Sequence, residues 1–195
     1  WAGIGDTYAK NYEAEISSRG EKLPHYTEVG VGFSKMCLTP MLEYGRQALE
    51  DNKKGVATEA LEQVALAIVV TTAIISIFLT RDFTPDYNSG LAHACFYALT
   101  AYPVIEKEHL HGEVVGFGVL YALLVDGQQE EFEKIYALNK ELGLPVRIAD
   151  IGITEEQFFE TMDRIPQMSD IRHYPYAVTK EMLMQAYETI EQLPV

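Results

Sequence analysis

Apolar residues recur every three or four positions along most of the chain, and few stretches alternate with the two-residue period of a strand. Gly, Pro and Asn residues separate these stretches. The pattern predicts an all-α fold, a bundle of roughly eight helices. The expected helices cover residues 7–19, 27–52, 59–79, 90–101, 111–125, 128–143, 154–164 and 177–192.

Local signals mark where several of these helices begin and end. Thr58 is the expected N-cap of the helix that follows it, and "TEEQ" at 154–157 has the spacing of a capping box. Gly143 is the expected stop of the helix before it. Pro40 should kink or split the helix over 27–52, and "RDFTPDYNSG" at 81–90 has the composition of a loop.

Residues 64–79, "VALAIVVTTAIISIFL", form the most apolar stretch and carry no charge. At sixteen residues the stretch is shorter than the roughly 18 to 20 that a membrane-spanning helix needs. We therefore expect no membrane span here but a helix buried on all sides within the bundle. With 48% hydrophobic and 23% charged residues, residues 1–195 should form one globular domain.

The net charge and the two cysteines indicate which partners and which cellular compartment to expect. A formal charge of -14 without a basic patch argues against nucleic acid or an anionic membrane surface as partner. Cys37 and Cys95 lie in apolar runs, so we expect buried free thiols in a reducing, cytoplasmic compartment. The chain begins "WAGIGD", without an initiator Met or a secretory signal, and is expected to be a piece of a longer protein.

Two histidines in neighbouring helices are the first candidate metal ligands. His93 and His111 could face each other across a helical hairpin, and neutral imidazoles suit zinc and other first-row metals. Asp6 follows two glycines at the expected mouth of the first helix and could supply an anionic third ligand. The alternatives are a core histidine, a histidine bound to a loop at a helix terminus and a helix-capping aspartate.

These residues lie in two recognisable motifs. "GIGDTYAKNYEAE" at 3–15 resembles the G-x-G-D-x-x-x-x-x-x-E element of the metal-dependent polyol and alcohol dehydrogenases. His93 and "HGEVVGFG" at 111–118 resemble the paired-histidine element H-x17-H-G-E-x-V-x-F-G of the same family, in its glycerol dehydrogenase branch. The resemblance covers essentially the whole chain as the C-terminal helical domain of a two-domain enzyme of the dehydroquinate synthase-like plan.

The resemblance implies a ligand set and a cofactor. It makes Asp6, His93 and His111 the metal ligands, with water or a substrate oxygen in the fourth position. It also implies a nucleotide-binding domain before Trp1 that holds NAD or NADP, which agrees with the lack of a G-x-G-x-x-G loop after a strand in this chain. Without that domain the isolated chain should be inactive.

Two positions depart from the family pattern. Lys10 stands where iron-type members have a further histidine, which favours zinc, with iron or another divalent metal as the alternative. Lys10 could contact a substrate carboxylate, as would suit the hydroxycarboxylate dehydrogenase branch, or it could pair with Glu13 or Glu15 or be solvated. Phe96 replaces a second histidine that glycerol dehydrogenases usually carry.

The function implied is a metal- and nicotinamide-dependent oxidoreductase acting on a small polyol, alcohol or 2-hydroxy or 2-oxo acid, as a homo-oligomer. A dehydroquinate synthase-like lyase is the alternative enzyme, although that group typically has a glutamate in place of Asp6. A helical module that only binds a metal or a partner is the non-catalytic alternative. His109 is expected to face solvent, and the glycines at 112, 116 and 118 to allow close helix packing.

Overall fold

The computed structural model describes residues 1–80 and 86–194 and shows an all-α fold, with no strand among these residues. The all-α prediction is confirmed. The helices are α1 (Ala2–Ser17), α2 (His25–Phe33), α3 (Lys35–Lys54), α4 (Glu59–Leu66), a π-helical turn (Ala67–Thr71), α5 (Thr72–Leu79), α6 (Leu91–Leu99), α7 (Pro103–Glu108), α8 (His111–Val125), α9 (Gln129–Leu142), α10 (Glu155–Arg164) and α11 (Lys180–Glu191).

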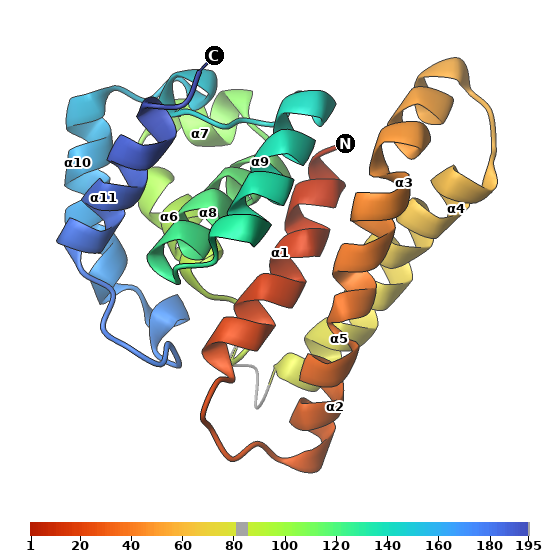
Figure 1. Ribbon diagram of the computed structural model, residues 1–195, viewed down its shortest axis with the longest axis horizontal. Helices are drawn as coiled ribbons and strands as arrows, with labels where there is room; N and C mark the ends of the chain where they lie inside the picture. The colour runs from red at the N-terminus through yellow and green to blue at the C-terminus, as the bar shows by residue number, and fades with distance from the viewer. Residues whose placement is uncertain (81–85, 195) are drawn as a thin grey trace.

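Helix α1 lies at the centre of the bundle, between two groups of helices (Figure 1). On one side α3 packs against it, and α4 returns antiparallel to α3 and continues into α5. On the other side α1 packs against α8, which in turn packs against α6 and α9. Helices α10 and α11 cover the far edge of this second group. The chain therefore brings residues from its start and its middle together along α1 and α8.

Helix α8 is the helix that is buried on all sides. Every residue from 112 to 123 is buried, and its aromatic side chains Phe117 and Tyr121 pack against Phe158 of α10. The largest fully buried side chains are aromatic and come from α1, α8, α9 and α10: Tyr8, Tyr12, Tyr121, Phe117, Phe132 and Phe158. These side chains form the core that fixes α8 against α1.

The prediction that residues 64–79 are buried on all sides is wrong. Only one face of α4 and α5 packs inward, with Ile75 and Leu79 buried, whereas Val69 and Ile77 are 68% and 72% exposed. Apolar composition does not reveal which segment the neighbouring helices enclose, and the fold encloses α8 instead. The continuous helix Glu59–Leu79 has 21 residues, and by length and composition alone it is long and apolar enough to cross a membrane. Within an apolar stretch of 18 of these residues, 17% are buried.

Several helix boundaries also differ from the prediction. The segment 27–52 divides at Ser34 rather than Pro40, which lies inside α3. Ser34 is buried there, donating its hydroxyl to the Val31 carbonyl and accepting from Asn11. The short helix α7 was not predicted, and residues 81–85 of the predicted loop lie outside the described residues.

The cap and cysteine predictions are confirmed. The Thr58 and Thr154 hydroxyls accept from the backbone N–H three residues later, and Gly143 ends α9 with a φ of 71°. Cys37 and Cys95 are buried free thiols. Signals that act within a few residues were therefore readable from the sequence.

Candidate metal centre

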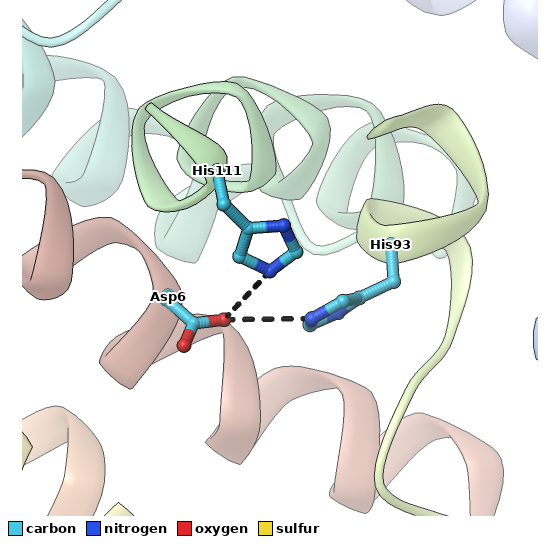
Figure 2. Close-up of side chains that lie close together, drawn as sticks. All are labelled: Asp6, His93 and His111. Carbon is cyan, nitrogen blue, oxygen red and sulfur yellow. Dashed lines mark ion pairs between the residues drawn. The ribbon is translucent and has the colours of Figure 1, made fainter. Parts of the chain in front are cut away.

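Three side chains from three helices meet at one point beside α1. Asp6 comes from α1, His93 from α6, and His111 is the first residue of α8 (Figure 2). The Asp6 Oδ1 atom lies 3.4 Å from Nε2 of His93 and 3.7 Å from Nε2 of His111. One donor atom from each residue lies within 4.8 Å of the other two. The structure thus brings together all three candidate ligands.

Glycines set the distance between α1 and α8 that makes this meeting possible. A Cβ atom built on Gly112 would lie 2.9 Å from the Ala2 carbonyl carbon and 3.2 Å from the Asp6 Cβ atom. Because real Cβ atoms do not approach so closely, the helix backbones can touch here only without side chains. Gly5 faces Gly112 and Gly116 in the same crossing.

The expected position of Asp6 at the mouth of the first helix is wrong. Helix α1 begins at Ala2, so Asp6 lies inside the helix rather than at its mouth. The glycine at position 5 serves the close approach of α8 rather than a bend of the backbone around a bound group. The predicted packing role of the α8 glycines is confirmed at 112, 116 and 118, each of which lies against a neighbouring backbone or side chain.

The chemistry of the donors fits a divalent cation. Asp6 Oδ1 is buried and accepts no hydrogen bond from the residues at 1–80 and 86–194, although two imidazole nitrogens face it. A buried carboxylate oxygen without a hydrogen bond is costly unless a cation compensates it. Two imidazoles and one carboxylate are a ligand set found in catalytic zinc sites, where a fourth position stays open. The described residues therefore fit zinc.

The electrostatics of the centre favour charged groups. Burial opposes the ionisation of Asp6, but His111 and His93 beside it hold the pKa of its carboxyl well below the usual value. Burial also opposes protonation of His93, yet the neighbouring Glu13 and Asp6 carboxylates raise the pKa of its imidazole to about 9. The Glu13 and Asp6 carboxylates, which face Nδ1 and Nε2 of His93 respectively, therefore favour positive charge on this ring or beside it.

His111 is the most accessible of the three candidate ligands. Its side chain is 43% exposed, while that of His93 is 8% exposed. The ring of His111 and that of Phe96 pack edge to face, with centroids 4.4 Å apart. Phe96, one of the two positions that depart from the motif pattern, thus packs against a candidate ligand.

Lys10 lies one turn after Asp6, buried rather than solvated. Its ammonium donates a hydrogen bond of 2.6 Å to the Asn88 carbonyl. No ion pair among the described residues joins it to Glu13 or Glu15, so neither of the expected alternatives holds. Its positive charge helps to keep the pKa of Asp6 low, after the two histidines. Lys10 therefore belongs to the surroundings of the centre.

Two glutamates next to histidines were not assigned a role from the sequence. Glu13 is fully buried and accepts a hydrogen bond of 2.6 Å from Nδ1 of His93. Glu113 accepts from Nδ1 of His109, whose side chain is 13% exposed, so the expectation that His109 faces solvent is wrong. Glu13 is the last residue of the first motif, seven positions after Asp6, and that spacing was the available signal.

Known proteins resemble the chain in sequence over nearly its full length. A glycerol dehydrogenase of Pseudomonas putida is 30% identical over 98% of this chain and 53% of that protein. Hydroxycarboxylate dehydrogenase A of Escherichia coli is 28% identical over 97% of this chain and 52% of that protein. No family model matches the chain. The chain spans about half the length of these curated relatives.

Solved structures share the fold. A probable glycerol dehydrogenase from Sinorhizobium meliloti 1021 superimposes with a TM-score of 0.82 at 21% identity, over 99% of this chain and 56% of that one. Both the sequence matches and the shared fold align this chain with about half of a glycerol dehydrogenase. The chain corresponds to the C-terminal helical domain of the glycerol dehydrogenase-like family.

Proposed function

We propose that this chain is the metal-binding half of a nicotinamide-dependent oxidoreductase that acts on a small polyol, alcohol or 2-hydroxy acid, or on the corresponding carbonyl compound. The convergence of Asp6, His93 and His111 around an unpartnered carboxylate oxygen is the observation that carries the proposal. The names of the relatives, glycerol dehydrogenase and hydroxycarboxylate dehydrogenase A, supply the reaction class. A cytoplasmic location agrees with the two free thiols.

The three ligand residues would hold zinc, with iron or another divalent metal as the alternative. A bound zinc ion would supply a Lewis acid that polarises the substrate oxygen. Asp6 offsets part of the positive charge, and the two imidazoles donate neutral nitrogens. His111, being half exposed, leaves its side of the centre accessible to a small molecule.

NAD or NADP would carry out the redox step. In the oxidative direction the oxidised nicotinamide would supply the acceptor for the hydride of the carbinol carbon, and the hydroxyl proton would leave to water. We place the nicotinamide site in a part of the protein outside residues 1–195, because the described residues include no glycine-rich loop between a strand and a helix. This chain contributes the binding and orientation of the substrate oxygen.

Lys10 is the residue that could distinguish a carboxylate substrate from a polyol. Its ammonium uses one N–H for the Asn88 carbonyl, which leaves two N–H donors. A substrate carboxylate near Asp6 could accept from them and offset the buried positive charge. This contact would favour a 2-hydroxy acid over glycerol.

Zinc binding by the chain itself tests the centre. Calorimetric titration should give one Zn²⁺ per chain, and His111→Ala should weaken the affinity at least about tenfold because it removes a ligand. His25→Ala, which changes an exposed histidine at the start of α2, is the matched control and should bind as tightly as the wild type. Equal affinity of the His111 variant and the control would refute the centre.

The reaction class is tested on the longest natural form of the protein. Oxidation of NADH or NADPH is followed with dihydroxyacetone and with a short 2-oxo acid. Lys10→Met, which removes the charge and keeps most of the side-chain volume, should raise KM for the 2-oxo acid and leave KM for dihydroxyacetone unchanged. An equal effect on both substrates would exclude the carboxylate contact.

A further inference from the structure

Glu13 contacts both the backbone and the side chain of a single ligand residue. It lies on α1 with its side chain fully buried against the start of α6. Its Oε1 atom accepts from the backbone N–H groups of Gly90 and His93, at 2.8 and 2.9 Å. Its Oε2 atom accepts from Nδ1 of His93 at 2.6 Å.

The hydrogen bond to Oε2 determines which imidazole nitrogen can bind a cation. In a neutral imidazole one nitrogen carries the proton and the other carries the lone pair. A carboxylate accepts only, so it holds the proton on Nδ1. Nε2, which faces Asp6 Oδ1 at 3.4 Å, is then the nitrogen that can exchange its proton for a cation and offer its lone pair.

Capping of α6 does not account for this arrangement. The two backbone N–H groups at the start of α6 are satisfied by Oε1 alone. The imidazole is the partner of Oε2, so the second oxygen acts on the ligand and not on the helix. For comparison, the ring of His111 makes no hydrogen bond through Nδ1 to any described residue, and packs against Phe96.

We propose that Glu13 is a positioning residue of the metal centre, which holds His93 with Nε2 directed at the cation and so raises the metal affinity. The inference rests on the proposed function, because it requires that Asp6, His93 and His111 bind a metal. Carboxylates that accept from the second nitrogen of a metal-binding histidine typically change metal affinity by about 10- to 100-fold. Glu13 touches neither substrate nor metal in this role.

The variant Glu13→Gln separates positioning from packing because it keeps the size of the side chain. Its single oxygen must serve the Gly90 and His93 backbone N–H groups, which turns the amide NH₂ toward Nδ1 of His93. The NH₂ group donates, so it favours the tautomer with the proton on Nε2, which cannot bind a cation. The geometry of the fold can stay the same while the donor atom is lost.

Glu113→Gln is the matched control. Glu113 is also a buried carboxylate that accepts from a histidine Nδ1, that of His109, and from a backbone N–H at a helix start, that of Leu110. His109 is not a ligand of the centre. The two substitutions therefore remove comparable hydrogen bonds, and only one of them acts on a ligand.

Calorimetric titration of the full chain with Zn²⁺, after circular dichroism has shown that each variant is helical, gives the decisive comparison. We expect Glu13→Gln to bind about 10- to 100-fold more weakly than the wild type and Glu113→Gln to bind within about threefold of it. Wild-type affinity in Glu13→Gln would overturn the role of Glu13 while leaving the centre intact. No Zn²⁺ binding by the wild type would overturn the proposed function and this role with it.

A spectroscopic measurement on the wild type keeps the inference testable if Glu13→Gln does not fold. In the zinc-loaded chain, ¹⁵N NMR of the histidine rings should show His93 with its proton on Nδ1 and the metal on Nε2. A proton on Nε2 with the metal on Nδ1 would overturn the proposal. A residue that only caps α6 would not determine this tautomer.

Discussion

The close approach of α1 and α8 can be tested by placing one methyl group between them. In Gly112→Ala the new Cβ atom would start 2.9 Å from the Ala2 carbonyl carbon. Carbon atoms in contact prefer about 3.5 to 4.0 Å, so the helices must separate by roughly 0.6 to 1 Å at the crossing. Metal ligands tolerate displacements of only about 0.2 Å, and Asp6 and His111 lie on opposite sides of this crossing.

The expected cost follows from two opposing effects. Overpacking of this kind typically costs about 1 to 3 kcal/mol of unfolding free energy. Replacing a helical glycine by alanine raises the unfolding free energy by up to about 1 kcal/mol, because alanine has the higher helix propensity. Gly32→Ala isolates the second effect, because a Cβ atom at Gly32 in α2 has no neighbour within 4 Å. Gly112→Ala should therefore be about 1 to 3 kcal/mol less stable than Gly32→Ala.

Urea denaturation of the metal-free chain measures the difference in stability, and Zn²⁺ titration measures the effect on the centre. We expect Gly112→Ala to lose both stability and metal affinity, and Gly32→Ala to bind Zn²⁺ as the wild type does. Equal stability and equal affinity of the two variants would show that α8 can shift without cost. The glycines would then not explain how the ligands meet.

Three further predictions concern the fold. Ile75→Ala should lower the unfolding free energy by about 2 to 5 kcal/mol, because Ile75 is 2% exposed. Ile77 is 72% exposed, so Ile77→Ala should change the unfolding free energy by no more than about 0.5 kcal/mol. Equal losses in urea denaturation would contradict the one-sided packing of α5. Thr154→Ala should lower the unfolding free energy by about 1 kcal/mol through loss of the α10 cap, and Thr154→Ser should restore most of it. Burial opposes ionisation of Asp126, but the two hydrogen bonds that Arg19 donates to it hold the pKa of its carboxyl below the usual value. Ionised Asp126 therefore stabilises the fold above about pH 4, and this contribution is lost as the pH falls through the lowered pKa. Asp126→Asn should destabilise the chain by about 1 to 3 kcal/mol at pH 7 and by less at pH 3, and a loss independent of pH would exclude the ion pair as its cause.

The sequence predicts those features that depend on neighbours along the chain. The Thr58 and Thr154 caps and the Gly143 stop each involve atoms three or four residues apart, and all three are present. The burial of a helix depends instead on which helices enclose it. Residues 64–79 and helix α8 are similarly apolar, and their composition could not show that α8 is enclosed while α5 keeps an open face.

At the candidate metal centre, too, contacts that depend on helix packing could not be read from the sequence. Motif spacing singled out Asp6, His93 and His111 as candidate ligands, and the structure places the three side chains together. The motif also contains Glu13, but it does not show which groups Glu13 contacts, because Gly90 and His93 lie 77 and 80 residues further along the chain. Only the packing of α1 against the start of α6 brings them within hydrogen-bond distance.

The three candidate ligands differ in how firmly the fold fixes them, and the difference indicates which side of the centre is accessible. Asp6 is held by the backbone contact between α1 and α8, and His93 by the buried Glu13 carboxylate. His111 is the first residue of α8, and its ring packs edge to face with Phe96. Its side chain is 43% exposed. Since two ligands are fixed from the inside of the bundle and the third lies at its surface, the accessible side of the centre is the His111 side. The proposed cation position is therefore open to a small molecule on the side of His111, away from the buried Glu13.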